Sequence, residues 1–171
     1  MKADYRTLLP EDFSNDSRVW IYQASRLLSL QEALRTEELL QEFTSQWKTH
    51  GTPVKGYGNL FFGQFIVLMA DESATGVSGC STDSSVRLIK QLEHEMKVSF
   101  FDRQLLAFYI REKIELIPLS QFDYAIRQQL LTPETLYFNN TVLTKKELET
   151  SWILPIRETW LARRLNTVQT N

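Results

Sequence analysis

The feature that most restricts the fold is an apolar run from Leu60 to Ala70, in which Gln64 is the one strongly polar side chain. A helix that crosses a bilayer needs about 20 apolar residues, and this run is about half that length. A short apolar run between polar flanks is typical of a strand that is buried on both faces of a sheet. We therefore expect residues 60–70 to form the central strand of a sheet, and we expect no membrane partner.

A weaker strand precedes the apolar run. Residues 54–57 have a strand-like composition, and Gly58 and Asn59 follow them with the residue types of a tight turn. These patterns predict a hairpin that turns at residues 58–59 and returns along residues 60–70.

Two long helices flank this hairpin. Ser29 and Glu32 have the spacing of a capping box, in which the hydroxyl and the carboxylate each bind a backbone amide at the helix start. Apolar residues then recur at helical spacing until Gly51, which predicts a helix over residues 30–50 with Gly51 as its C-cap. A second helix is expected over residues 84–97, with Thr82 or Asp83 as its N-cap.

The remaining elements follow the same kinds of pattern. We expect a first strand at residues 19–22, a second hairpin from residues 104–110 and 113–117, an edge strand at 136–138, and helices beginning near 121 and 145. Asn139 and Asn140, after the edge strand, are typical of a turn.

The order of the first six elements is βαββαβ, which predicts the fold class. We expect an α+β protein: a single two-layer sandwich with a ferredoxin-like core, an extra hairpin strand and C-terminal helices. Residues 1–17 should form an N-terminal arm, residues 18–165 a single domain, and residues 166–171 a frayed tail.

Charge and cysteine content exclude several classes of protein. Nineteen Lys and Arg against 21 Asp and Glu give a formal charge of −2, without a basic face of the kind that binds nucleic acid. One cysteine excludes an internal disulfide, and with only two histidines the chain lacks the ligands of a structural zinc site. The first residues have no apolar signal segment. We expect a cytoplasmic protein with no metal, no cofactor and no nucleic-acid partner.

The loop over residues 75–85 is the segment that core packing explains least. Its small residues precede a predicted helix, where exposed backbone amides and the helix dipole favour an anion. The residues that we expect to bind such a ligand are Ser78, Gly79, Ser81, Thr82, Asp83, Ser84 and Ser85. The competing interpretation is purely structural, because Ser, Thr and Asp are also the residues that cap helices.

Cys80 lies in the same loop and suggests a second chemistry. The field of a helix N-terminus lowers the pKa of an exposed thiol there, which makes the thiol a catalytic nucleophile or redox group. A histidine base is not expected nearby, because His94 lies far along the predicted helix and His50 ends the other helix. The sequence also has no Walker A lysine loop, no nucleophile elbow and no dinucleotide fingerprint.

Several segments over residues 18–160 carry a resemblance to a known family. They are residues 18–23, Trp47 with residues 50–51, and residues 78–86, 89–93, 138–140, 147–149, 152 and 155. On these segments the chain resembles a family of small uncharacterised bacterial proteins, some of which carry the label "ABC transporter ATPase". An ATPase of that kind needs the Walker A loop that this sequence lacks, so the resemblance implies a bacterial protein without that activity.

Two hypotheses about function follow. The first is a non-enzymatic protein that binds a small anionic ligand, or assembles with a partner, through the loop at 75–85. A homodimer that uses the late apolar segment around Trp160 belongs to this hypothesis. The alternative is a thiol-dependent enzyme or redox protein in which Cys80 is the reactive group.

Overall fold

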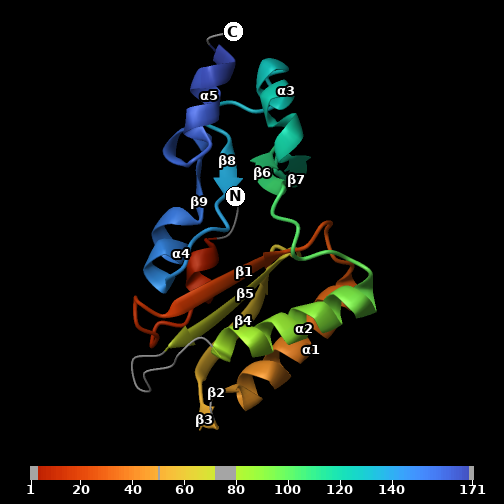
Figure 1. Ribbon diagram of the computed structural model, residues 1–171, viewed down its shortest axis with the longest axis vertical. Helices are drawn as coiled ribbons and strands as arrows, with labels where there is room; N and C mark the ends of the chain where they lie inside the picture. Colours follow the sequence, from red (N-terminus) through yellow and green to blue (C-terminus); the bar gives the residue numbers. More distant parts are fainter. Residues whose placement is uncertain (1–3, 50, 72–79, 170–171) are drawn as a thin grey trace.

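The two larger antiparallel sheets, of three and four strands, occupy opposite halves of an elongated molecule (Figure 1). The computed structural model describes residues 4–49, 51–71 and 80–169. Helices and strands lie in separate segments, so the α+β class is confirmed.

The first sheet contains β1 (Arg18–Gln23), β4 (Lys55–Phe61) and β5 (Phe65–Asp71) in the order β1-β5-β4, with all neighbours antiparallel. All seven residues of β5 are buried. Ile66 and Leu68 face one hydrophobic cluster, and Phe65, Val67 and Met69 face another, as expected of a strand with no solvent-exposed face. A central strand buried on both faces is therefore confirmed for residues 65–71.

The predicted limits of this hairpin are wrong, because the apolar run is not one strand. Phe62 and Gly63 have φ angles of 55° and 63°, which places the turn inside the run and splits it between β4 and β5. Gly58 and Asn59 lie within β4 and not in a turn. A bulky residue such as Phe62 rarely adopts a left-handed conformation, so composition favoured the wrong position for the turn.

α1 (Leu30–Gln46) and α2 (Cys80–Met96) cover one face of the first sheet (Figure 1). Leu40 of α1 and Ile89 and Leu92 of α2 are fully buried against it. The other face of the sheet packs against the N-terminal arm, in which η1 (Tyr5–Leu8) and the buried Phe13 contribute to the second cluster.

The predicted ends of both helices need correction. α1 stops at Gln46 because the chain continues into a small hairpin, β2 (Lys48–Thr49) and β3 (Thr52–Pro53), which turns at Gly51 with a φ of 81°. Gly51 is therefore a hairpin residue and not the C-cap, and His50 lies outside the described residues. α2 begins at Cys80, so Thr82 and Asp83 lie in its first turn and neither is its N-cap.

The second sheet has the order β7-β6-β8-β9. Its strands are β6 (Leu105–Ile110), β7 (Lys113–Pro118), β8 (Leu136–Phe138) and β9 (Ile153–Pro155). A strand is present at residues 136–138, but β8 pairs with both β6 and β9, so it is an inner strand and not the expected edge strand. The predicted second hairpin is confirmed. So is the helix start near residue 145, where Thr144 accepts a hydrogen bond from the amide of Glu147 at the beginning of α4 (Lys145–Ser151).

The ferredoxin-like arrangement is not confirmed. It would place the strand after α2 beside β1, yet this strand, β6, pairs with β7 and β8 in the other sheet. Two further helices, α3 (Phe122–Arg127) and α5 (Ala162–Gln169), pack on this second sheet, and α5 continues into the predicted tail. The order of elements along the chain is as expected, but one strand is paired elsewhere.

Trp152 lies at the centre of the packing between the two sheets. Its side chain is fully buried, and its ring centroid lies 5.6 Å from Phe61, 5.6 Å from Phe65 and 5.9 Å from Phe138. Tyr5 of the arm meets the same ring edge-on at 4.9 Å. One aromatic cluster thus joins β4, β5, β8 and the N-terminal arm.

We expect the Trp152→Ala substitution to lower the free energy of unfolding by about 3–5 kcal/mol, because it removes a large buried ring and leaves a cavity. The measurement is urea denaturation followed by circular dichroism. Trp160→Ala is the control, since 44% of the surface of this tryptophan is exposed, and its effect should be clearly smaller. Equal losses for the two variants would contradict the central role of Trp152.

The capping box of α1 is confirmed and is reinforced by an ion pair. Glu32 accepts a hydrogen bond from the amide of Ser29 at 2.7 Å, and Arg26 donates two bonds of 2.8 Å to the same carboxylate. These bonds from Arg26, and next the bond from the Ser29 backbone, lower the pKa of Glu32 from 4.5 to about 2. Arg26 also donates to the carbonyl of Met96, so the pair links the start of α1 to the end of α2.

A lowered pKa in the folded state stabilises the protein above the unfolded pKa, and this contribution is lost as the pH falls towards the folded pKa. The stability difference between the native protein and Glu32→Gln should therefore be larger at pH 6 than at pH 2. Urea denaturation at both pH values measures it. Glu37→Gln changes an exposed carboxylate of the same helix and serves as the control. A pH-independent effect of Glu32→Gln would contradict the assignment.

Candidate functional site

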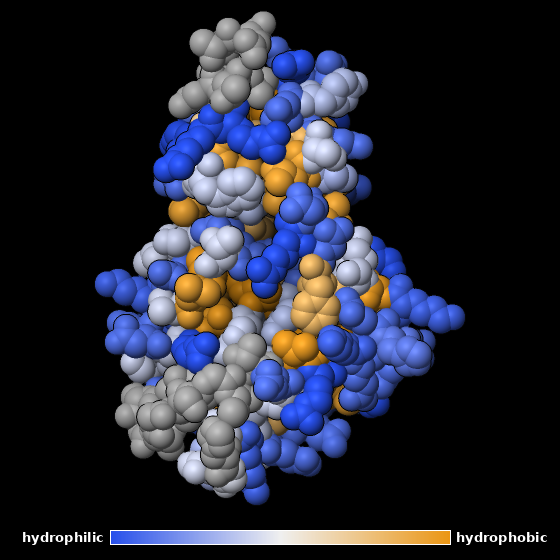
Figure 2. Space-filling view, viewed as in Figure 1, coloured by the Kyte–Doolittle hydropathy of each residue, from blue (hydrophilic) through white to orange (hydrophobic). Residues whose placement is uncertain are grey.

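A cleft of about 460 Å³ lies where the two sheets meet, and its residues come from both. Apolar surface is visible in the middle of the molecule, where the narrower upper half joins the broader lower half (Figure 2). The first sheet contributes residues 19–23 of β1, and the second contributes residues of β6 and β8. The segments at 100–103 and 140–143 line the remaining sides.

The outer edge of β1 is paired at both ends and open between them. The amide of Val19 donates to the carbonyl of Leu143 at 2.9 Å, and the amide of Ser25 donates to the carbonyl of Ser99 at 2.8 Å. The backbone amide of Ala24 donates to the carbonyl of Gln64, in the register of the pairing between β1 and β5. Because bonded residues alternate along a strand, Trp20 and Tyr22 form the backbone bonds to β5. The backbone groups of Ile21 and Gln23 therefore point towards the cleft, where no described residue pairs with them.

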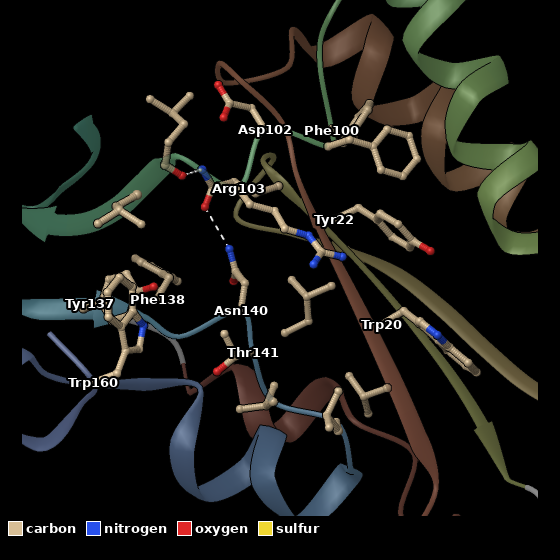
Figure 3. A pocket seen from close by; sticks show the side chains of 18 of the residues that line it. Trp20, Tyr22, Phe100, Asp102, Arg103, Tyr137, Phe138, Asn140, Thr141 and Trp160 are labelled. Atoms are coloured by element: carbon tan, nitrogen blue, oxygen red, sulfur yellow. Dashed lines mark hydrogen bonds between the residues drawn. The ribbon is translucent and has the colours of Figure 1, made fainter. Parts of the chain in front are cut away.

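A chain of side-chain hydrogen bonds holds the two walls of the cleft together. The side-chain amide of Gln23 donates from Nε2 to the carbonyl of Leu105 at 2.9 Å. The side-chain amide of Asn140 donates from Nδ2 to the Oε1 atom of Gln23 at 2.8 Å, and dashed lines mark both bonds in Figure 3. The indole of Trp152 donates in turn to the Oδ1 atom of Asn140 at 3.0 Å. Strands from both sheets are thereby fixed to one another at the floor of the cleft.

Arg103 supplies the positive charge of the cleft. Its side chain is exposed, extends towards Tyr22 (Figure 3), and forms no ion pair with any described residue. The neighbouring carboxylate of Asp102 accepts a hydrogen bond from the amide of Gln104 at 2.9 Å and points away from the guanidinium in the same view. An exposed guanidinium without a carboxylate partner is suited to bind an anion.

Aromatic rings stand on both sides of the cleft. Phe101 meets Tyr22 edge-on at 5.7 Å on one side, and Trp160 meets Tyr137 edge-on at 6.3 Å on the other. Phe101 and Trp160 are 39% and 44% exposed, so each offers ring surface to a ligand. Trp160 thus lines the cleft, and the homodimer contact expected from this residue stays a prediction.

Tyr22 connects the cleft to α2. Its hydroxyl lies 3.2 Å from the Oγ atom of Ser85, and both residues are buried. Burial raises the pKa of the Tyr22 phenol, while the bond to Ser85 and the charge of Arg103 act in the opposite direction. Val86, the next residue of α2, lines the cleft directly.

The site predicted at residues 75–85 is described only in part. Ser78 and Gly79 lie outside the described residues, and the structure does not describe the side chains of Cys80, Ser81 and Thr82, which begin α2. Further along the helix, Asp83 is exposed, Ser84 is half-buried and Ser85 is buried beside Tyr22. Anion binding by this loop and reactivity of Cys80 therefore stay predictions.

Sequence reasoning missed the cleft. Residues 18–23 were recognisable as a strand and residues 139–140 as a turn, but nothing in either pattern shows that they face each other. The useful signal was Gln23, a polar residue at the end of a buried strand, because a buried amide requires hydrogen-bond partners.

Comparisons with models of protein families, with curated proteins and with solved structures find no match to this chain. The resemblance to small bacterial proteins stays a prediction. Within residues 4–49, 51–71 and 80–169, no helix combines the length and the apolar character needed to cross a bilayer.

The bond between Gln23 and Asn140 can be tested by a double-mutant cycle with Gln23→Leu and Asn140→Leu. Each single change leaves a polar group of the other residue without its partner, whereas the double change removes both. We expect the double variant to lose less stability than the sum of the single losses, with a coupling of about 0.5–3 kcal/mol in urea denaturation. Additive losses would show that the two side chains do not interact.

Proposed function

We propose that this chain is a non-enzymatic binding protein, and that the cleft between its two sheets holds a small ligand with an anionic group. The observation that carries this proposal is Arg103, an exposed cation without a described ion-pair partner beside an aromatic-lined cleft of about 460 Å³. Cavities of this size with apolar walls and a few polar groups are typical of ligand sites.

The chemistry of the lining supports binding more than catalysis. Among the described residues that line the cleft, Asp102 is the one carboxylate, and none is a histidine or a cysteine. The polar side chains are instead amides and hydroxyls, namely Gln23, Asn140, Thr141, Tyr22 and Tyr137. Such groups orient a ligand through hydrogen bonds and do not supply a general base near neutral pH.

The sequence-based hypothesis of an anion-binding protein is thus kept, and its site is moved. The loop at 75–85 remains part of the proposal as a neighbouring segment, because α2 begins there and reaches the cleft through Val86. A cytoplasmic location, expected from the single cysteine, also belongs to this proposal.

A pair of fluorescent probes tests the charge requirement. 1-Anilinonaphthalene-8-sulfonate carries one sulfonate, and N-phenyl-1-naphthylamine has the same aromatic body without the charge. We expect saturable binding of the sulfonate probe to the folded protein, with a Kd about tenfold higher in Arg103→Gln, which corresponds to the loss of one charge-assisted contact. Binding of the neutral probe should not change.

Arg127→Gln is the matched control, because Arg127 is an exposed arginine of α3 that does not line the cleft. An Arg103→Gln variant that binds both probes as tightly as the native protein would contradict the proposal. So would equal effects of the two arginine substitutions on the sulfonate probe.

A further inference from the structure

The open edge of β1 has the regular spacing of an unfilled strand position. Ile21 and Gln23 are two residues apart, so their outward amide and carbonyl groups repeat at about 6.8 Å along the cleft. This is the repeat with which a neighbouring strand offers its own backbone groups.

In a ferredoxin-like sheet β6 would pair with the outer edge of β1. Here β6 pairs with β7 and β8 in the other sheet, so the position beside β1 is open. The sheet ends at β1 between the bonds to Leu143 and Ser99. The distance from Val19 to Ser25 along the strand is roughly 20 Å. Because both ends are occupied, the space between them takes only a few residues of extended chain.

The positive charge of Arg103 favours a peptide that carries a negative charge where it meets the cleft. Arg103 extends to Tyr22, whose neighbours Ile21 and Gln23 carry the open backbone groups (Figure 3). A short peptide that pairs with β1 and ends beside Tyr22 therefore brings its terminal group close to the guanidinium. The group at a peptide end that complements a guanidinium is the terminal carboxylate, which forms paired hydrogen bonds with arginine.

We propose that the ligand of the cleft is the C-terminal end of a polypeptide, which adds three or four residues as a strand beside β1 and places its carboxylate on Arg103. This inference rests on the proposed function, because it names the ligand class of the same site. Backbone pairing gives the bound chain its register, and the aromatic rings of Phe101 and Trp160 contact its side chains.

The first experiment is a selection with acetylated tetrapeptides that are randomised at every position and end in a free carboxylate. Native protein and Arg103→Gln are immobilised separately, and bound peptides are identified by mass spectrometry. We expect peptides that are retained by the native protein and displace 1-anilinonaphthalene-8-sulfonate from it. The Kd of a selected peptide should rise about tenfold in Arg103→Gln, and its C-terminal carboxamide should bind both proteins equally weakly.

The second experiment tests strand pairing itself. A selected peptide is N-methylated at one amide at a time, which removes the donor without changing the protein. Because alternate residues of a strand face its neighbour, methylation should abolish binding at every second position and be tolerated between them. Bound peptide should also slow hydrogen exchange of the Ile21 and Gln23 amides at least tenfold, while Trp20 and Tyr22, already bonded to β5, change little.

Three results would overturn the inference: no peptide that displaces the sulfonate probe, equal sensitivity to methylation at all positions, or unchanged exchange at Ile21 and Gln23. Each is distinguishable from failure of the proposed function. If the sulfonate probe binds through Arg103 and no peptide displaces it, the cleft is an anion site without peptide specificity. If the Kd of the sulfonate probe is also unchanged in Arg103→Gln, both proposals are wrong.

Discussion

The side chain of Gln23 is the link on which the shape of this molecule depends. It reaches from the last residue of β1 to the carbonyl of Leu105 in the other sheet, and Asn140 and Trp152 complete its hydrogen bonds. A buried amide is costly unless its donor and acceptor are both satisfied, so this chain of bonds favours the arrangement in which all three bonds form. The aromatic cluster around Trp152 buries apolar surface and so stabilises the packing of the two sheets. The hydrogen bonds set the position of one sheet against the other.

Local signals in the sequence correctly predicted the elements that depend on neighbouring residues. The capping box of Ser29 and Glu32 marks the start of α1, Thr144 marks the start of α4, and the hairpin of β6 and β7 follows its apolar pattern. The turn at Phe62 and Gly63 was missed because a left-handed phenylalanine contradicts residue preference. Packing of Phe61, Phe62 and Phe65 around Trp152 accounts for this turn, and such packing has no local signature.

Strand pairing between distant segments was the larger difference. The pattern βαββαβ gives the order of the elements along the chain and does not determine which strands pair. The pairing of β6 in a second sheet therefore could not be predicted from periodicity. The candidate site was missed for the same reason, since its walls come from segments more than 100 residues apart, such as Gln23 and Asn140. Arg103 also gave no signal, because one arginine in a loop has no distinctive neighbours in sequence.

The bonds from Val19 to Leu143 and from Ser25 to Ser99 have a consequence for self-association. An exposed strand edge normally invites pairing with identical edges, which leads to strand-swapped dimers and fibrils. Here the two bonds occupy both ends of the edge, so that among the described residues only the backbone groups of Ile21 and Gln23 are left open to an identical edge. The same pair of hydrogen bonds therefore shortens the edge that is open to self-association and, in the peptide-binding proposal, sets the length of strand that the cleft accepts.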